Sequence, residues 1–358
     1  MNFSGLRIGF VPYYDLTHPW NLRNFLYYAR KRNLKFEIAD PNKEYDIVIL
    51  SPIADISVWS KYPKGGKTKI IFFLVDSYLS TPQGNFKGAF RGLAKFLTGE
   101  QRHLKFNYCK ELQNMCDRAD AVACTTLEQQ SDISKHCNNV HIILECHFKS
   151  VRHSKLDYNI DSRVNLVWEG LPSNVESFSK FKDVLIKLRN KYPIYLHIIT
   201  DLLHKKYLNR IGRTDMVREV EKTLGATSHL NSETIFYMYQ WNLDTFSHIA
   251  TACDIAIIPL DTNNFLQRGK PENKLLLFWR MGIPTLTSST PAYSRAMDAC
   301  GLDLYCENKN EWIEKLERVI VDTDIRKNAG LTGKQHADTH YSEKVYLEKW
   351  DCLFESVL

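Results

Sequence analysis

Residues 253–295 carry the pattern that most restricts how this chain can fold. The apolar run at 255–258 stops at Pro259, as expected for a strand that is buried on both faces. A polar loop follows, and from Pro271 to Gly282 apolar side chains recur at helical spacing. Another short strand is expected just after this segment. The order strand, loop, helix and strand predicts one β-α-β unit of a parallel sheet.

The loop of this unit carries three cations, Arg268, Lys270 and Lys274, beside the start of the predicted helix. A helix N-terminus offers free N–H groups and a positive dipole, so together with these cations it suits a diphosphate. The alternative is an ordinary basic loop in contact with water.

The run Pro271-Glu272-Asn273-Lys274-Leu275, with Gly282 and Pro284 after it, resembles the donor-binding segment of GT-B glycosyltransferases. The resemblance is to the retaining, metal-independent group that includes glycosyltransferase family 4. It implies that Lys274 meets the diphosphate of a nucleotide sugar, and we expect Glu272 and Asn273 to hold the hydroxyls of the donor sugar.

The same group commonly carries two glutamates separated by seven residues. Aligned on Gly282 and Pro284, these positions are Gly269 and Leu277 here. The usual ribose-binding carboxylate is therefore missing at its place, and Glu272 is the acid that remains in the segment.

Strand and helix patterns alternate along the rest of the chain, which favours doubly wound parallel sheets. Helices are expected at 21–32, 127–136, 244–251, 311–320 and 340–358. We therefore predict an α/β protein with two Rossmann-like domains facing a cleft. The predicted parts are an acceptor-side domain (1–150), a nucleotide-sugar-binding domain (151–338) and a C-terminal helix crossing back to the first domain (339–358).

Ligands of doubly wound sheets bind beyond the strand C-termini, and three polar residues of the first half, Asp15, His18 and Asp76, follow predicted strands. His18 and Asp76 are candidate catalytic residues that steer the acceptor or bind sugar, and Glu272 is a third candidate. For His18 the alternative is a loop histidine that makes a backbone hydrogen bond.

In the second half, Glu169 ends a predicted strand, and Gly170, Ser173 and Asn174 follow it. Their N–H groups and side chains could bind an anion, or Ser173 could simply cap a helix. Glu169 is a further candidate for the acceptor or sugar.

Tyr239 and Trp241 end another predicted strand. The resemblance places this turn against the nucleotide base. The alternative is that both rings belong to the core.

Composition excludes several classes of protein. A net charge of +6 over 358 residues is too mild for a dedicated nucleic-acid binder. The nine cysteines show no metal-binding spacing, so we expect reduced, buried thiols in a cytoplasmic protein. We see no signal peptide and no run apolar enough to span a membrane.

Residues 86–110 hold six Lys or Arg against a single acid, with aromatic side chains at helical spacing. This pattern suits peripheral contact with an anionic membrane, including an inner membrane surface. The alternative is a helix that buries its apolar face in the domain.

The leading hypothesis is a glycosyltransferase. The resemblance implies transfer with retention from a nucleotide-diphosphate sugar to a glycan or lipid-linked acceptor, in polysaccharide or surface-glycan biosynthesis. We expect no cofactor and no metal, and we interpret the Asp-x-Asp sequence at 322–324 as a turn. The alternatives are a nucleotide-sugar epimerase or phosphorylase of the same fold, and a catalytically degenerate scaffold subunit.

Overall fold

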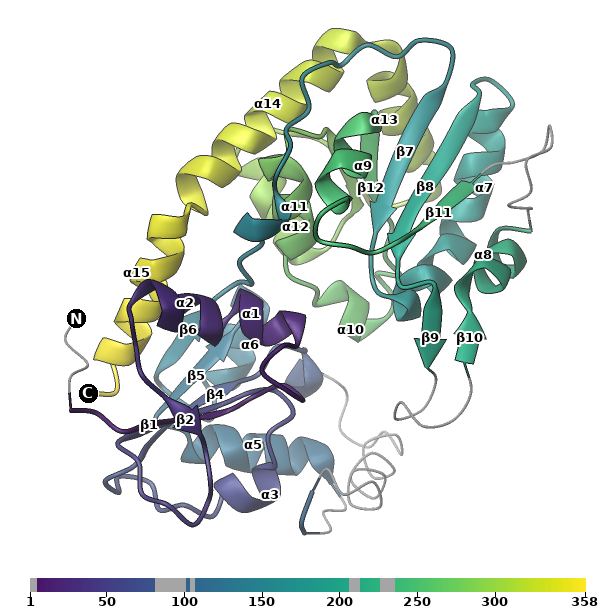
Figure 1. Ribbon diagram of the computed structural model, residues 1–358. Coiled ribbons are helices and arrows are strands. Elements are labelled where there is room, and N and C mark those ends of the chain that lie inside the picture. The colour runs from purple at the N-terminus through teal and green to yellow at the C-terminus, as the bar shows by residue number, and fades with distance from the viewer. Residues whose placement is uncertain (1–4, 81–100, 104–106, 206–212, 226–235) are drawn as a thin grey trace. The chain divides into compact units, whose positions relative to one another are not determined.

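The computed structural model describes residues 5–80, 101–103, 107–205, 213–225 and 236–358. The chain divides into two compact units (Figure 1). The first comprises 1–146, 269–271 and 343–358, and the second comprises 147–268 and 272–342. Most of the predicted basic helix at 86–110 lies outside the described residues.

The first unit is built on a six-stranded parallel sheet in the order β2-β1-β3-β4-β5-β6. Its elements are β1 (Ile8–Val11), α1 (Pro19–Arg23), α2 (Phe25–Lys31), β2 (Glu37–Ile38), β3 (Ile47–Leu50), α3 (Ile56–Trp59), β4 (Lys69–Phe73), η1 (Tyr78–Ser80), α5 (Tyr108–Arg118), β5 (Ala121–Cys124), α6 (Leu127–Ile133), β6 (Val140–Ile142) and α15 (Glu343–Glu355).

The second unit repeats the plan, with a six-stranded parallel sheet in the order β11-β8-β7-β12-β13-β14. Its elements are η2 (Phe148–Ser150), β7 (Val164–Glu169), η3 (Pro172–Ser177), α7 (Phe178–Arg189), β8 (Ile194–Thr200), β9 (Leu203–Lys205), β10 (Arg213–Asp215), α8 (Met216–Leu224), β11 (Phe236–Gln240), α9 (Phe246–Ala252), β12 (Ile255–Ile258), α10 (Phe265–Arg268), α11 (Asn273–Arg280), β13 (Thr285–Ser288), α12 (Pro291–Asp298), β14 (Tyr305–Cys306), α13 (Lys309–Val321) and α14 (Thr323–His340).

Strand order reverses once in each sheet. In the first sheet the chain passes from β1 to β2 on one side and to β3 on the other, and in the second sheet β7 stands between β8 and β12. Because parallel crossovers are right-handed, α7 and α8 cover one face of the second sheet, while α9, α11 and α12 cover the other (Figure 1). Ligand crevices in such sheets lie at the carboxyl ends of the strands that flank this reversal.

The structure corrects three details of the sequence analysis. The helix expected at 21–32 is broken at Asn24 into α1 and α2. The helix after the basic loop begins at Asn273 rather than at Pro271. The Asp-x-Asp sequence at 322–324, expected to be a turn, is the start of α14: Asp322 caps this helix by accepting a hydrogen bond from the Ile325 N–H, and the next two residues lie in its first turn.

A long helix that the sequence patterns did not predict, α14, packs closely against α11. A Cβ atom at Gly330 would lie 2.3 Å from the Gly282 carbonyl oxygen, and one at Gly333 would lie 2.6 Å from the Trp279 ring. Two glycines therefore allow this approach, and they also weaken the helical signal of the segment.

The C-terminal helix α15 belongs to the first unit, where it covers one face of the sheet. Trp350 is fully buried, and its ring stacks on Tyr28 at 5.1 Å and lies 5.3 Å from Phe73. Tyr28 also donates a hydrogen bond to Asp351, which pairs with Arg32. Aromatic packing, together with this polar contact, fixes the helix to α2 and β4.

We predict that Trp350→Ala lowers the free energy of unfolding of the first unit by about 3–5 kcal/mol, the usual cost of deleting a buried tryptophan side chain. Urea denaturation followed by far-UV circular dichroism measures this change. The control is Glu348→Ala on the same helix, where the side chain is 55% exposed and should contribute less than about 1 kcal/mol. Equal midpoints for the two variants would contradict the prediction.

Candidate functional site

The candidate site lies in the second unit, where β7 ends beside the start of α11. The β7 strand ends at Glu169, and Gly170 follows. Because β7 stands at the reversal of strand order, its carboxyl end is where this type of sheet binds ligands.

Lys274, in the first turn of α11, reaches this strand end. Its Nζ atom donates to the Glu169 carbonyl oxygen at 2.7 Å and lies 3.7 Å from the Glu169 carboxylate. The ammonium group also stands 5.1 Å from the centre of the Trp168 ring, within cation–π range. Three contacts therefore hold one positive charge at the end of β7.

Gly170 is required for this arrangement. A Cβ atom at Gly170 would lie 2.4 Å from Lys274 Nζ and 2.5 Å from the Trp168 ring. Both distances are shorter than real contacts, so any larger residue would displace the lysine or the indole.

The N-terminus of α11 adds polar groups to the site. Glu272 is the N-cap residue, but its side chain makes no capping hydrogen bond. It accepts a hydrogen bond from the Tyr341 hydroxyl at 3.3 Å instead. The Oδ1 atom of Asn273 is shielded from solvent and has no hydrogen-bond partner among the described residues.

Burial and the nearby carboxylates raise the pKa values of two tyrosines at this site. The pKa of Tyr293, which is buried behind it, is raised by burial and then by the charges of Glu272 and Glu169. Burial and Glu272 also raise the pKa of Tyr341. Both hydroxyls thus remain protonated, and the Tyr341 hydroxyl is a hydrogen-bond donor to Glu272.

Ser173 and Asn174 lie within the short helix η3 that follows Gly170. Leu171, rather than Ser173, is the residue before this helix, and it makes no side-chain cap. The alternative of a Ser173 cap is therefore wrong. Ser173 is exposed and Asn174 is half-buried, and both follow the strand end that carries Gly170.

Tyr239 and Trp241 have separate partners. The Tyr239 hydroxyl lies 2.9 Å from His197 Nδ1. The Trp241 ring stacks on Phe246 at 6.5 Å. His197 Nε2 lies 3.1 Å from the side-chain oxygen of Asn165, which can only accept, so Nε2 carries the proton and Nδ1 accepts from Tyr239.

The remaining candidates lie elsewhere in their units. Arg268 ends the short helix α10. Lys270 is grouped with the first unit, where its Nζ atom pairs with Asp76 at 3.3 Å.

His18 caps α1 in the first unit, where its Nδ1 atom accepts from the Trp20 N–H at 3.2 Å and its ring stacks on Tyr13. Burial lowers the pKa of His18, although Asp15 opposes the shift. The predicted alternative, a loop histidine with a backbone hydrogen bond, describes this contact.

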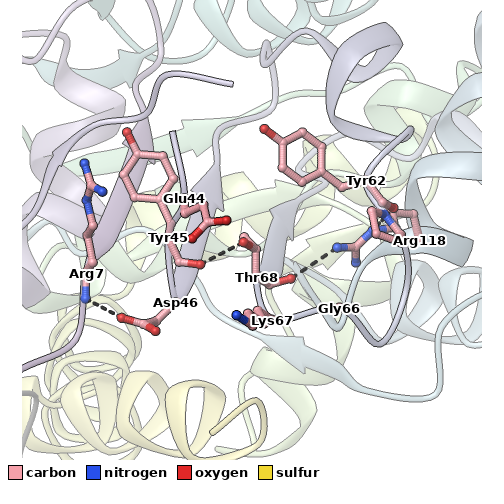
Figure 2. A pocket seen from close by; sticks show the side chains of 10 residues that line it. Arg7, Glu44, Tyr45, Asp46, Tyr62, Gly66, Lys67, Thr68 and Arg118 are labelled. Carbon is pink, nitrogen blue, oxygen red and sulfur yellow. Dashed lines mark hydrogen bonds between the residues drawn. The ribbon is translucent and has the colours of Figure 1, made fainter. Parts of the chain in front are cut away.

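A separate pocket of about 290 Å³ lies at the opposite, amino end of the first sheet (Figure 2). Its polar groups bond to one another. The Arg7 N–H donates to Asp46, and the buried Arg118 donates to the Thr68 carbonyl oxygen and pairs with Asp120. Because these groups already have partners and lie at the amino ends of the strands, whereas such sheets bind ligands at the carboxyl ends, we place no site there.

The part of the chain that the structure describes contains no group of three or more His, Cys, Asp or Glu side chains placed to hold a metal ion. None of the described helices has the length and apolar character that a membrane crossing requires. All nine cysteines are free thiols, and six of them are buried.

The sequence matches no known family model and no curated protein. Solved structures of glycosyltransferases are nevertheless similar. Sucrose-phosphate synthase from Thermosynechococcus elongatus has a TM-score of 0.60 at 11% identity, over 97% of this chain and 80% of that chain. A glycosyltransferase from Rickettsia africae has a TM-score of 0.55 at 12% identity, over 96% and 83%.

The structure of TarM from S. aureus, solved with UDP, has a TM-score of 0.56 at 11% identity and is matched over 86% of this chain. The present chain spans 55% of the TarM chain. The chain therefore has the GT-B fold of glycosyltransferases, with two Rossmann-like domains, as its sequence predicted.

Sequence reasoning identified Lys274, Glu272, Asn273 and Gly170 but missed their supporting side chains. Trp168 is one of several apolar residues in a predicted strand, with no local signal for its contact with Lys274, and the contact of Tyr341 with Glu272 spans 69 positions. Tyr341 stands at the start of the last predicted helix, and no local pattern links it to Glu272.

The geometry around His197 generates a pH prediction. Burial lowers its pKa from 6.5 to about 4. Between about pH 6.5 and 4, His197 is protonated in the unfolded chain but neutral in the folded protein. It therefore lowers the free energy of unfolding as the pH falls through this range. We expect an upper bound of about 3 kcal/mol for this loss, from the size of the shift.

Urea unfolding of wild type and His197→Gln at a series of pH values between 7 and 4 tests this expectation. Wild type should lose more stability than the variant over this range, because glutamine does not titrate. Parallel pH profiles for the two proteins would show that His197 titrates normally.

Proposed function

We propose that this protein is a glycosyltransferase that moves a sugar from a nucleotide-diphosphate sugar to a glycan or lipid-linked acceptor, with retention at the anomeric carbon. The observation that carries the proposal is the position of Lys274. Its ammonium group stands at the carboxyl end of β7, at the start of α11, and beside Gly170, where a larger residue would displace the lysine or the Trp168 ring.

The reaction separates two charges, a leaving diphosphate and an oxocarbenium-like sugar. In our proposal Lys274 and the uncapped N-terminus of α11 stabilise the diphosphate as it leaves. Arg268 and Lys270, which the sequence predicts for the same role, stay predictions, because Arg268 ends α10 and Lys270 is grouped with the first unit, where it pairs with Asp76. The carboxylate of Glu169 orients the ammonium group and keeps it at the strand end.

Glu272 and Asn273 are the proposed ligands of the donor sugar. Sugar hydroxyls can donate to the Glu272 carboxylate. The Asn273 Oδ1 atom has no partner among the described residues, and because it is shielded from solvent its side chain has to turn outward to accept from a hydroxyl. Gly170, Ser173 and Asn174 are proposed to donate to the phosphates, and Tyr239 and Trp241 to border the base. His18 and Asp76 are proposed to act on the acceptor. The domain limits predicted from the sequence, cytoplasmic location and membrane contact through 86–110 belong to the same proposal.

One observation favours a second candidate, a degenerate GT-B protein that serves as a binding or scaffold subunit. Leu277 occupies the position of the usual ribose-binding glutamate, and its side chain is only 3% exposed. A buried leucine can neither bond a ribose hydroxyl nor be reached by one. An epimerase is distinguished by conversion of the donor sugar in the absence of acceptor.

We predict that Lys274→Ala lowers sugar transfer at least tenfold, because a charge-assisted contact to the diphosphate is worth about 1.5–3 kcal/mol. The matched control is Lys309→Ala, which removes a surface lysine of the same unit that pairs with Asp183. Transfer rates from radiolabelled nucleotide sugars measure both. Equal activity in Lys274→Ala and wild type would remove this lysine from the diphosphate site.

Nucleoside diphosphates are expected to raise the melting temperature of the purified protein. A ligand at about 100 times its dissociation constant adds about 2.7 kcal/mol of stability. A thermal-shift screen with UDP, GDP, CDP, ADP and TDP, with magnesium or with a chelator, measures the effect and identifies the base. A shift with one nucleotide that a chelator leaves unchanged supports a metal-independent transferase. No shift with any nucleotide favours the scaffold.

A further inference from the structure

An apolar groove of about 700 Å³ opens on the first unit, beside α1 and α2. Its walls come from the loop after β1, from one face of α1 and α2, and from the segment that leads into β2. Six apolar side chains line it: Leu16, Leu22, Leu26, Ala29, Leu34 and Phe36. Its size falls within the range of small-molecule pockets, about 300–1,000 Å³.

The groove is open at one side and closed at its floor. Leu16 is 40% exposed, whereas Leu26, Ala29 and Leu34 are buried. An exposed leucine above a buried apolar floor loses contact with water when an apolar chain enters, and this favours burial of such a chain.

The charged residue among those that line the groove is a cation, whereas the carboxylate of Asp15, beside the groove, is bonded to Thr17. Arg30 lines the groove, and its lining residues include no Asp or Glu. The two cations that follow are used by α15, since Lys31 pairs with Glu343 at 2.8 Å and Arg32 with Asp351. Arg30 has no ion pair with any residue that the structure describes, so the cation of the groove's lining is available to an anionic group.

The groove also adjoins the ligand edge of the first sheet. Leu16 and Thr17 belong to the loop that leaves the carboxyl end of β1, where the strand order reverses between β1 and β3. His18, the proposed acceptor residue, is the next residue of this loop. A molecule in the groove therefore lies next to the loop on which we place acceptor binding.

We infer that the groove binds the hydrocarbon chain of the acceptor, and that the acceptor is an amphiphile with an anionic head group that meets Arg30. This inference rests on the proposed transferase function and selects the lipid-linked class of acceptor over a free glycan. The apolar lining recognises the chain, and Arg30 recognises the head group.

Isothermal titration with dodecyl phosphate, kept below the concentration at which it forms micelles, tests the inference on the full chain. Wild type should bind it saturably, with one site. Leu16→Glu should weaken binding at least tenfold, because it places an anion in the apolar groove. The matched control is Leu127→Glu, since Leu127 is 49% exposed in the same unit but does not line the groove.

A second pair of variants tests the head group. Arg30→Gln should weaken dodecyl phosphate about fivefold but leave uncharged dodecyl maltoside unchanged, whereas Lys61→Gln, a change of an exposed lysine outside the groove, should alter neither. Inorganic phosphate should not bind measurably, because it has no chain.

Three results would overturn the inference. These are absence of saturable binding, equal losses in Leu16→Glu and Leu127→Glu, or binding only to vesicles that contain anionic lipid, which would indicate a membrane surface. The nucleotide screen is run on the same samples without amphiphile. Dodecyl phosphate binding without any nucleotide shift would refute the transferase proposal and the acceptor role, whereas a nucleotide shift without dodecyl phosphate binding would refute the groove alone.

Discussion

A parallel sheet has to bury both of its faces, and this requirement organises the whole chain. Each of the two sheets is parallel throughout, so each needs helices on both sides. The first unit completes one of its faces with α15, a helix from the far end of the sequence, whose Trp350 is fully buried on Tyr28 and Phe73. The helix α15 is therefore an integral part of the first unit, and its removal would expose one face of that unit's sheet.

The packing of helices on the second sheet also brings positive charge to the carboxyl end of one of its strands. The helix α11 covers one face, so its N-terminus comes to the carboxyl end of β7, and Lys274 reaches the Glu169 carbonyl oxygen. On the inner side of the same helix, Leu277 is buried and offers no polar group. It leaves no carboxylate at the position where the sequence resemblance expects one, so in our proposal the hydroxyl contacts come from the half-buried start of the helix, from Glu272 and Asn273.

The β-α-β order could be predicted because buried strands and helix spacing are local patterns. The predictions failed where contacts between residues distant in the sequence decide the local structure. Asn24 breaks the first helix by donating its buried side chain to the Trp20 carbonyl oxygen. The glycines of α14 weaken its helical signal, yet they are the residues that admit Trp279 and the Gly282 carbonyl. The contact of Lys274 with Glu169 spans 105 positions, so no local pattern could predict it.

The two proposed binding regions differ in chemistry as the two halves of a transfer reaction require. The region in the second unit combines a lysine, a helix N-terminus and hydrogen-bonding side chains, which suits a polar, doubly charged donor. The groove in the first unit combines an apolar floor with Arg30 at its side, which suits an amphiphile. Each region is formed by residues of a single unit, so each ligand can bind without the other. Binding of each can therefore be measured separately, and only transfer requires both.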